Sequence, residues 1–357
     1  MSYHPVRTQR GLEVLTGLIP WTIILFPFIG SFFIPEIVAY FVIAFNVYWL
    51  YRSLQMTIYA IAGYLNVKAT QKIDWLSKLQ NDYQTKLEFD NILHLIIIPT
   101  VNEPINILER NLNAITAQKY NLKKIHVVLA MEERAGEKAH QTAMELIAKY
   151  KNRFANLYAT FHVLKPGETM GKHSNDTFAT KTARDNMVKK SKLNQDQILV
   201  TICDADGVLP DNYFALLTYK FLVSPNHYHK FFQAPQFTYN NLHRVPLLVR
   251  LPSVIGNIYM LSILQKLSKR FMISAIYSTS LNLLETVGYW DLDFIPEDWH
   301  LYLKSYFTLK GDVDVIPLYL PIYIDAAEST SRWKTFKNSY EQLKRWAWGS
   351  VDIPYVV

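Results

Sequence analysis

The stretch "ILVTICDADG", residues 198–207, reads as a buried strand that ends on two acids. Its residues from Ile198 to Ile202 are mostly apolar and β-branched, which is typical of a fully buried parallel strand. Asp204 and Asp206 follow one residue apart, where like charges repel unless something positive lies between them. That positive group could be a metal ion, a bound ligand, or an Arg or Lys of the same chain. Because open α/β sheets bind ligands just outside the carboxyl ends of their strands, the position favours a metal or nucleotide site.

The composition allows a large core and an anionic partner. The chain has 357 residues, of which 50% are hydrophobic, and its formal net charge is +7. Such a charge suits nucleic acid, a phosphate-bearing substrate or an acidic membrane surface. The single cysteine, Cys203, excludes an internal disulfide and favours a reducing, cytoplasmic setting for the folded part. The sequence has no internal repeats and no paired Cys/His cluster of the zinc type.

The first seventy residues differ from the rest. No Lys or Arg occurs between Arg10 and Arg52, and two apolar runs on either side of Pro35 are long enough to cross a bilayer as helices. Basic residues flank the pair and are missing from the turn at 31–36, so the positive-inside rule places both ends in the cytoplasm. The sequence therefore predicts a multi-pass protein of the cell membrane with its folded part in the cytoplasm. A buried hairpin of a soluble protein is the alternative.

The expected organisation has four parts. Residues 1–65 form the membrane hairpin and 66–91 an amphipathic linker helix. Residues 92–330 form the main folded domain, and 331–357 a helix followed by the start of a membrane-proximal region.

Residues 92–330 show an alternating pattern of predicted strands and helices. Strands are predicted at 92–99, 124–131, 157–164 and 197–203, each followed by a helix, at 105–117, 136–150, 174–190 and 210–223. Further strands are expected at 229–237 and 270–277, with a long apolar helix at 245–267 between them. Such alternation predicts an α/β fold with a mainly parallel sheet that helices cover on both faces.

Polar residues stand at the ends of all four leading strands. They are, in chain order, Glu103, Glu132, Lys172 and the pair Asp204 and Asp206. Each alone could be a surface acid, a helix cap or a solvated lysine. Four in succession at one sheet edge indicate a nucleotide site.

Two later stretches add to this pattern. "FIPEDWHLYLK" places Glu297 and Asp298 at the start of a helix, where both could simply favour the helix dipole. "YEQLKRWAWGS" places Gln342 and Arg345 on one helix face, followed by Trp346. An Arg suits a phosphate and a Trp a sugar ring, although an amphipathic helix with an incidental basic residue is the alternative.

Together these motifs resemble the family 2 glycosyltransferases, in particular the membrane-embedded branch of cellulose, chitin and hyaluronan synthases. The resemblance covers residues 92 to about 350. It implies a GT-A-like fold behind an N-terminal transmembrane hairpin. It also implies inverting transfer of a sugar from a nucleotide donor, UDP being expected, to a glycan or lipid-linked acceptor. Mg²⁺ or Mn²⁺ is the implied cofactor, the lipid bilayer is a partner, and nucleic acid is not.

The resemblance also assigns roles on the donor side. The acid of "PTVNE", Glu103, and more weakly Glu132 are expected at the nucleotide base, and Lys172 of "GK" at the diphosphate. In "DADG", Asp204 lies nearer the uridine and shares the metal with Asp206.

The late motifs supply the catalytic side by the same resemblance. In "PEDW", Asp298 is the expected general base and Glu297 its neighbour. In "QLKRW", Gln342, Arg345 and Trp346 are expected to bind the nucleotide-sugar.

The sequence departs from the family in several places. Pro296 replaces the usual Thr, "MEER" replaces an aspartate pair, and "AIYSTSLNLL" replaces the acceptor stretch of cellulose synthases. The chain also stops soon after Trp346, so it is either a truncated piece or lacks the polymer channel. Two alternatives stay open: a single-addition transferase acting on a polyprenyl or lipid carrier, and a membrane-anchored binding protein without turnover.

Overall fold

A seven-stranded sheet forms the centre of the molecule in the computed structural model, which describes residues 6–266, 271–294, 296–347 and 352. Within these residues the strand order is β3-β2-β1-β4-β7-β5-β8. The strands are β1 (Leu93–Thr100), β2 (Ile125–Glu132), β3 (Asn156–His162), β4 (Ile198–Ile202), β5 (Lys230–Gln233), β7 (Tyr277–Ser280) and β8 (Asp314–Pro317).

The sheet is mainly parallel, as the sequence predicts. β1 pairs in parallel with β2 and β4, β2 with β3, and β5 with β8. Among these described strands, β7 runs antiparallel to both its neighbours, β4 and β5. The carboxyl ends of β1 to β4 therefore meet at one edge of the sheet.

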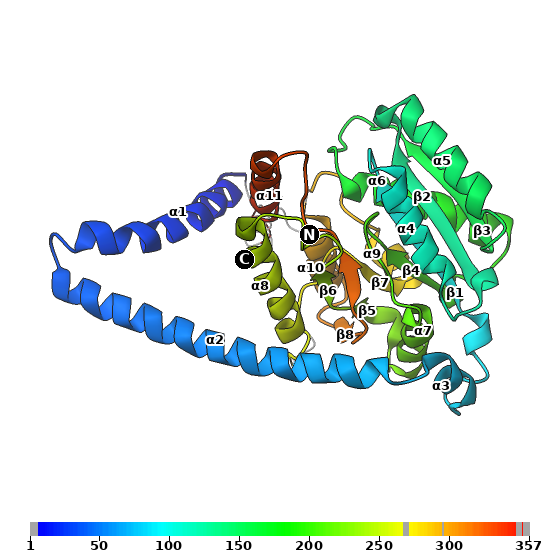
Figure 1. The fold of residues 1–357 in the computed structure, drawn as a ribbon, viewed down its shortest axis with the longest axis horizontal. Coiled ribbons are helices and arrows are strands. Elements are labelled where there is room, and N and C mark those ends of the chain that lie inside the picture. The colour runs from blue at the N-terminus through cyan, green and yellow to red at the C-terminus, as the bar shows by residue number, and fades with distance from the viewer. Residues whose placement is uncertain (1–5, 267–270, 295, 348–351, 353–357) are drawn as a thin grey trace.

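Helices cover both faces of the sheet (Figure 1). Ile96 and Ile98 of β1 pack into the core under α4 (Ile105–Thr116), α5 (Glu137–Tyr150) and α7 (Tyr213–Val223). Leu95 and Ile97 pack into the opposite core. That second core lies under α6 (Lys172–Arg184), α9 (Leu281–Val287) and α10 (Glu297–Thr308). Burial on both sides explains why residues 95–98 of β1 form an unbroken apolar run.

Two long apolar helices precede this domain. α1 (Val6–Gly30) and α2 (Pro35–Gln71) form an open V and meet near their connecting turn, where the rings of Phe26 and Phe41 lie 5.0 Å apart (Figure 1). Both helices are long and apolar enough to cross a membrane, which is weak support for the expected hairpin.

The linker differs from the expected single helix over 66–91. α2 continues to Gln71, and a short helix α3 (Trp75–Asn81) follows before turns and a 3₁₀ segment at Phe89–Asn91. The break occurs at Asp74, whose side chain accepts a hydrogen bond from the backbone N–H of Ser77 and so starts a new helix.

Three further predicted elements were wrong in extent. The strand expected at 229–237 divides into β5 and β6 (Gln236–Thr238), and β6 pairs with β9 (Ile322–Ile324) in a separate small sheet. Of the strand expected at 270–277, residue 270 lies outside the described residues. Among residues 271–277 only Tyr277, the first residue of β7, is in a strand, because Ala275 has φ +45 and cannot continue one. The helix expected at 174–190 is α6 followed by a π-helical turn, Asp185–Lys190.

α2 is attached to the domain through α8 (Leu247–Ile263), the apolar helix between β6 and β7. The contact is close at Gly63, where an added Cβ would lie 2.5 Å from the carbonyl oxygen of Leu261. Farther along, Asn66 Nδ2 donates to Gln265 Oε1 at 3.1 Å. The absence of a side chain at Gly63 is therefore what lets the two helix backbones approach.

Replacing Gly63 by Ala should loosen this attachment. Alanine normally stabilises a helix interior by roughly 0.5–1 kcal/mol over glycine, but here its methyl group overlaps a backbone oxygen. Overpacking of this kind costs about 1–3 kcal/mol. Thermal unfolding in detergent should show Gly63→Ala less stable than the parent.

Gly256→Ala, in α8 itself, is the matched control because a Cβ there meets nothing within 4 Å. It should leave the melting temperature unchanged or raise it. Equal melting temperatures for the two variants would contradict the close α2–α8 contact.

Candidate active site

The polar residues at the strand ends lie at one edge of the sheet. Glu103 follows β1, Glu132 ends β2, and Lys172 begins α6 after the β3 loop. Asp204 and Asp206 follow β4 directly. These residues therefore lie at the carboxyl ends of neighbouring strands, as expected from the sequence.

The "DADG" turn is held from beneath by hydrogen bonds. The side-chain amide of Asn111 donates to the carbonyl oxygens of Asp204 and Gly207, at 3.1 and 2.8 Å. Gly207 lies against Ile276, where a Cβ would come within 2.6 Å of the Ile276 methyl group. These contacts fix the turn so that the two carboxylates project from a rigid backbone.

Lys172 is the positive group beside the acid pair. Its ammonium donates to Asp204 Oδ1 at 2.6 Å and to the carbonyl oxygen of Ala275 at 3.0 Å, and it lies 3.5 Å from Glu297 Oε1. Burial alone would lower the pKa of Lys172, but the carboxylates of Asp204, Glu297 and Asp176 outweigh burial and raise the pKa well above its usual range. Lys172 is therefore a fixed cation at neutral pH.

Asp298 joins the same group through the backbone. Its Oδ2 accepts a hydrogen bond from the backbone N–H of Ala275 at 2.8 Å, and Ala275 is also the residue whose carbonyl binds Lys172. Removal from water, together with the charge of Glu297, raises the pKa of Asp298 to about 7. A carboxylate with this pKa can take up a proton near neutral pH.

The stretch 271–276 thus has a role that the sequence did not predict. Instead of forming a strand, it passes between α6 and α10, and both polar atoms of the Ala275 peptide serve the site. The positive φ of Ala275 turns the backbone to make both bonds possible.

Asp206 lies in surroundings with excess negative charge. Its Oδ2 accepts a hydrogen bond from the backbone N–H of Asp325, which follows β9, at 2.9 Å. Burial, with the charge of Asp204, raises the pKa of Asp206 to about 7. The acid Asp325 was missed by sequence reasoning, although it follows an apolar strand as Asp204 and Asp206 do.

The donor set suits a hard divalent cation, which prefers carboxylate oxygens. Within the described residues, however, no cluster of three or more His, Cys, Asp or Glu side chains could hold an ion alone. Asp204 and Asp206 fit a metal that takes its other ligands from a bound phosphate and water.

Glu103 and Glu132 stand at the expected edge but are engaged locally. Glu103 accepts hydrogen bonds from Thr100 and from the backbone N–H of Val101. Glu132 is buried and pairs with Arg134. Neither contacts Lys172 in the part of the chain that the structure describes.

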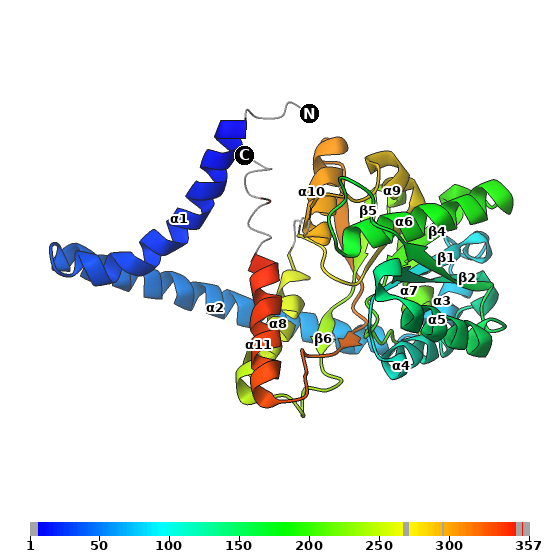
Figure 2. The same cartoon turned by 90° about the horizontal axis from the view of Figure 1, so that it is seen from above.

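The three residues of the "QLKRW" stretch lie apart from the carboxylates. They belong to α11 (Arg332–Ala347), which packs on α8 (Figure 2). Arg345 and Trp346 are exposed, and Gln342 is partly buried. Among the described residues, no hydrogen bond or ion pair joins them to Asp204 or Asp298, so the structure does not bring the two halves of the expected site together.

Two other residues have an ordinary explanation. Burial raises the pKa of the Cys203 thiol to about 12, so Cys203 is not a nucleophile. His300, the second candidate for a base, has both ring nitrogens in contact with carboxylates, so neither nitrogen is open to take a proton from an acceptor.

Comparison with known proteins finds a family model that matches part of the chain. A search of curated proteins finds no match. Among solved structures, S. aureus TarS 1-349 in complex with UDP-GlcNAc aligns at 15% identity and a TM-score of 0.44, over 71% of this chain and 66% of that one. The mannosyltransferase PcManGT from Pyrobaculum calidifontis, in complex with GDP-Man and Mn2+, aligns at 14% identity and a TM-score of 0.45, over 81% of this chain and 76% of that one. The chain thus spans just under two thirds of the TarS fragment. Residues 199–356 match the family described as Glycosyl transferase family group 2.

Proposed function

We propose that the protein is a membrane-bound, inverting glycosyltransferase that moves a sugar from a nucleotide donor, UDP being expected, to a glycan or lipid-linked acceptor. The observation that carries this proposal is the convergence of Lys172, Asp204, Glu297 and Asp298 at the carboxyl edge of the sheet. The family match over residues 199–356 includes three of these four residues and supports the same reading.

The residues divide between binding and chemistry. Lys172 would bind the diphosphate oxygens, exchanging its bond with Asp204 for bonds to the donor while keeping Glu297 beside it. Glu103 and Glu132 would face the base end of the nucleotide. Arg345 and Trp346 would contact the donor or the acceptor sugar from α11, with Gln342 on the same helix face.

Asp298 would be the general base. Its carboxylate takes the proton of the acceptor hydroxyl as that oxygen attacks the anomeric carbon, and the bond from this carbon to the diphosphate breaks. A single displacement of this kind inverts the anomeric centre without a covalent sugar–enzyme intermediate.

Asp204 and Asp206 would hold a Mg²⁺ or Mn²⁺ ion, which offsets the negative charge on the leaving diphosphate. The raised pKa of Asp206 supports this assignment, because a carboxylate crowded by Asp204 is stabilised by a nearby cation.

The N-terminal helices support the membrane assignment. Most apolar side chains of α1 and of the first half of α2 are exposed, as in Trp21, Phe28 and Tyr40. Such a surface suits lipid rather than water. The basic residues that flank the pair favour a cytoplasmic position for the catalytic domain.

Asp298→Asn should abolish transfer while sparing donor binding. The amide keeps the size of the carboxylate but cannot accept the proton, and loss of a positioned base costs about a hundredfold to ten-thousandfold in rate. Radiolabelled UDP-sugars with purified protein in detergent would measure the rate, and UDP titration the affinity. Because burial disfavours the charged form of Asp298, the variant should melt no lower than the parent at pH 8.

Glu297→Gln is the matched control, one residue away in the same helix turn. It should lower the rate less, since Glu297 neighbours Lys172 rather than accepting the proton. Near-parental transfer by Asp298→Asn would move the base elsewhere.

Asp206→Asn should remove the metal dependence of nucleotide binding. Two carboxylates alone make a poor magnesium site, so UDP and the metal are expected to bind together. Calorimetric titration with UDP in Mn²⁺ and in EDTA should show a difference for the parent and none for the variant.

The control for this experiment is Asp211→Asn, whose carboxylate pairs with Lys119 at the surface. It should bind UDP as the parent does. Equal UDP affinity of the parent with and without metal would rule out the metal assignment.

A further inference from the structure

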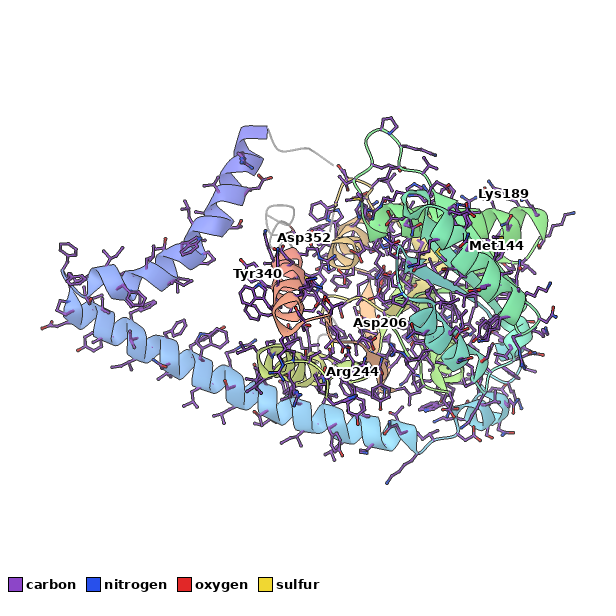
Figure 3. All side chains as sticks on the ribbon, turned by 45° about the horizontal axis from the view of Figure 1, so that its top comes forward. Met144, Lys189, Asp206, Arg244, Tyr340 and Asp352 are labelled. Carbon is purple, nitrogen blue, oxygen red and sulfur yellow. The ribbon has the colours of Figure 1, made fainter. Side chains whose placement is uncertain are left out.

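A buried histidine links the chain beyond α11 to the helix that carries Asp298. His300 lies on α10 and is 4% exposed, and the ring of Phe294 stacks on it at 4.0 Å. Its Nε2 lies 2.8 Å from Asp291 Oδ2, and its Nδ1 lies 2.9 Å from Asp352 Oδ1. Asp352 is itself 2% exposed and lies near the C-terminal end of α11 (Figure 3).

The geometry fixes the protonation state of His300. A carboxylate only accepts hydrogen bonds, and a neutral imidazole has one N–H. With both acids ionised, contacts of 2.8 and 2.9 Å on opposite ring nitrogens therefore require an imidazolium. Burial alone would lower the pKa of His300, but Asp291 and Asp352 outweigh burial and raise the pKa above the usual value.

The two carboxylates are not held equally. Asp291 also accepts a hydrogen bond from the ammonium of Lys304 at 2.5 Å, and Lys304 donates to the carbonyl oxygen of Tyr289 at 2.9 Å. By contrast, Oδ2 of Asp352 has no partner among the described residues. When His300 loses a proton, one of its two bonds must break, and the bond to Asp352 is the one without support.

Charged groups of three described segments face His300. They are Asp291 from the loop after α9, Lys304 from α10 itself, and Asp352 from the segment after α11. The four charges of this group balance when His300 is protonated.

The position of Asp352 limits the movement of α11. Asp352 lies five positions beyond Ala347, the last residue of α11, and five chain positions span at most about 18 Å. His300 is two residues along α10 from Asp298. A bond between Asp352 and His300 therefore limits how far the end of α11 that carries Arg345 and Trp346 can move from α10.

We propose that His300 is a positioning residue: as an imidazolium it clamps Asp352, and thereby holds the Arg345–Trp346 end of α11 beside the helix that carries the catalytic base. The catalytic meaning of this clamp rests on the proposed glycosyltransferase function, whereas the clamp itself does not. Its pH dependence follows from the raised pKa of His300. The bond is fully present below the unfolded pKa of about 6.5 and is lost as pH rises through the folded value.

Hydrogen exchange of the peptide covering residues 341–357 tests the clamp without any substrate. The full-length protein in detergent is measured from pH 6 to pH 9, after correction for the intrinsic pH dependence of exchange. The parent should protect this peptide at pH 6 and lose protection as pH rises. His300→Gln and Asp352→Asn should each exchange about tenfold faster at pH 6 and show no pH step, since a hydrogen bond to a charged group is lost.

His229→Gln is the matched control, because His229 Nδ1 lies 2.9 Å from Oδ2 of Asp312, which follows the opposite end of α10 from His300. It should behave as the parent. Parental protection in both His300→Gln and Asp352→Asn, or a parent without a pH step, would overturn the clamp.

A second measurement separates the clamp from the enzyme activity. Hydrolysis of UDP-glucose, UDP-N-acetylglucosamine and GDP-mannose is followed for the same proteins. Asp352→Asn should raise KM several-fold or more with a smaller change in kcat, because Arg345 and Trp346 are displaced while Asp298 stays in place. An unchanged KM alongside faster exchange would overturn the positioning role. If the exchange results hold but the parent hydrolyses none of the donors, the proposed function fails and the clamp stands.

Discussion

The candidate site depends on the contacts that the ammonium group of Lys172 makes. It neutralises Asp204, lies beside Glu297 and binds the backbone of Ala275, so it touches three segments that are far apart in sequence. Without this cation, the carboxylates of Asp204, Glu297 and Asp298 would repel one another in a partly dry environment. In the proposed reaction a donor diphosphate would use the same positive charge, so one residue would both stabilise the carboxylates and bind the anion.

The sheet supplies the geometry for this interaction. Parallel strands bring the ends of β1 to β4 to one edge, and antiparallel β7 brings the segment 271–276 back to the same edge from the other direction. Ala275 then links Lys172 on α6 to Asp298 on α10 through its two backbone polar groups. Lys172 and Asp298 are thus joined through main chain, which holds them more rigidly than side-chain contacts alone.

Some of this could be predicted from the sequence, for clear physical reasons. Apolar runs that end in polar residues predicted the parallel strands and the placement of Glu103, Glu132, Lys172 and Asp204 at one edge. The sequence did not decide which positive group offsets the acids of "DADG". The structure places Lys172 beside Asp204.

Other features depend on contacts between distant residues. The backbone turn at Ala275 is held by hydrogen bonds to Lys172 and Asp298, which are distant in sequence. The local sequence carries no sign of these bonds and therefore predicted a strand. The ring of His300 is held by Asp352, which lies 52 residues later. The position of α11 depends on packing against α8, and helix periodicity alone gave no sign of it.

The central claim is that Asp298 activates an acceptor oxygen for attack on the face opposite the leaving diphosphate. Proton NMR of the sugar first released from an α-linked UDP-sugar, with water as the acceptor, tests this claim most directly. The account predicts the β-anomer as the first product, formed by the parent and not by a variant without the base. Release of the α-anomer first would contradict inversion, and binding of the donor without any release would contradict catalysis.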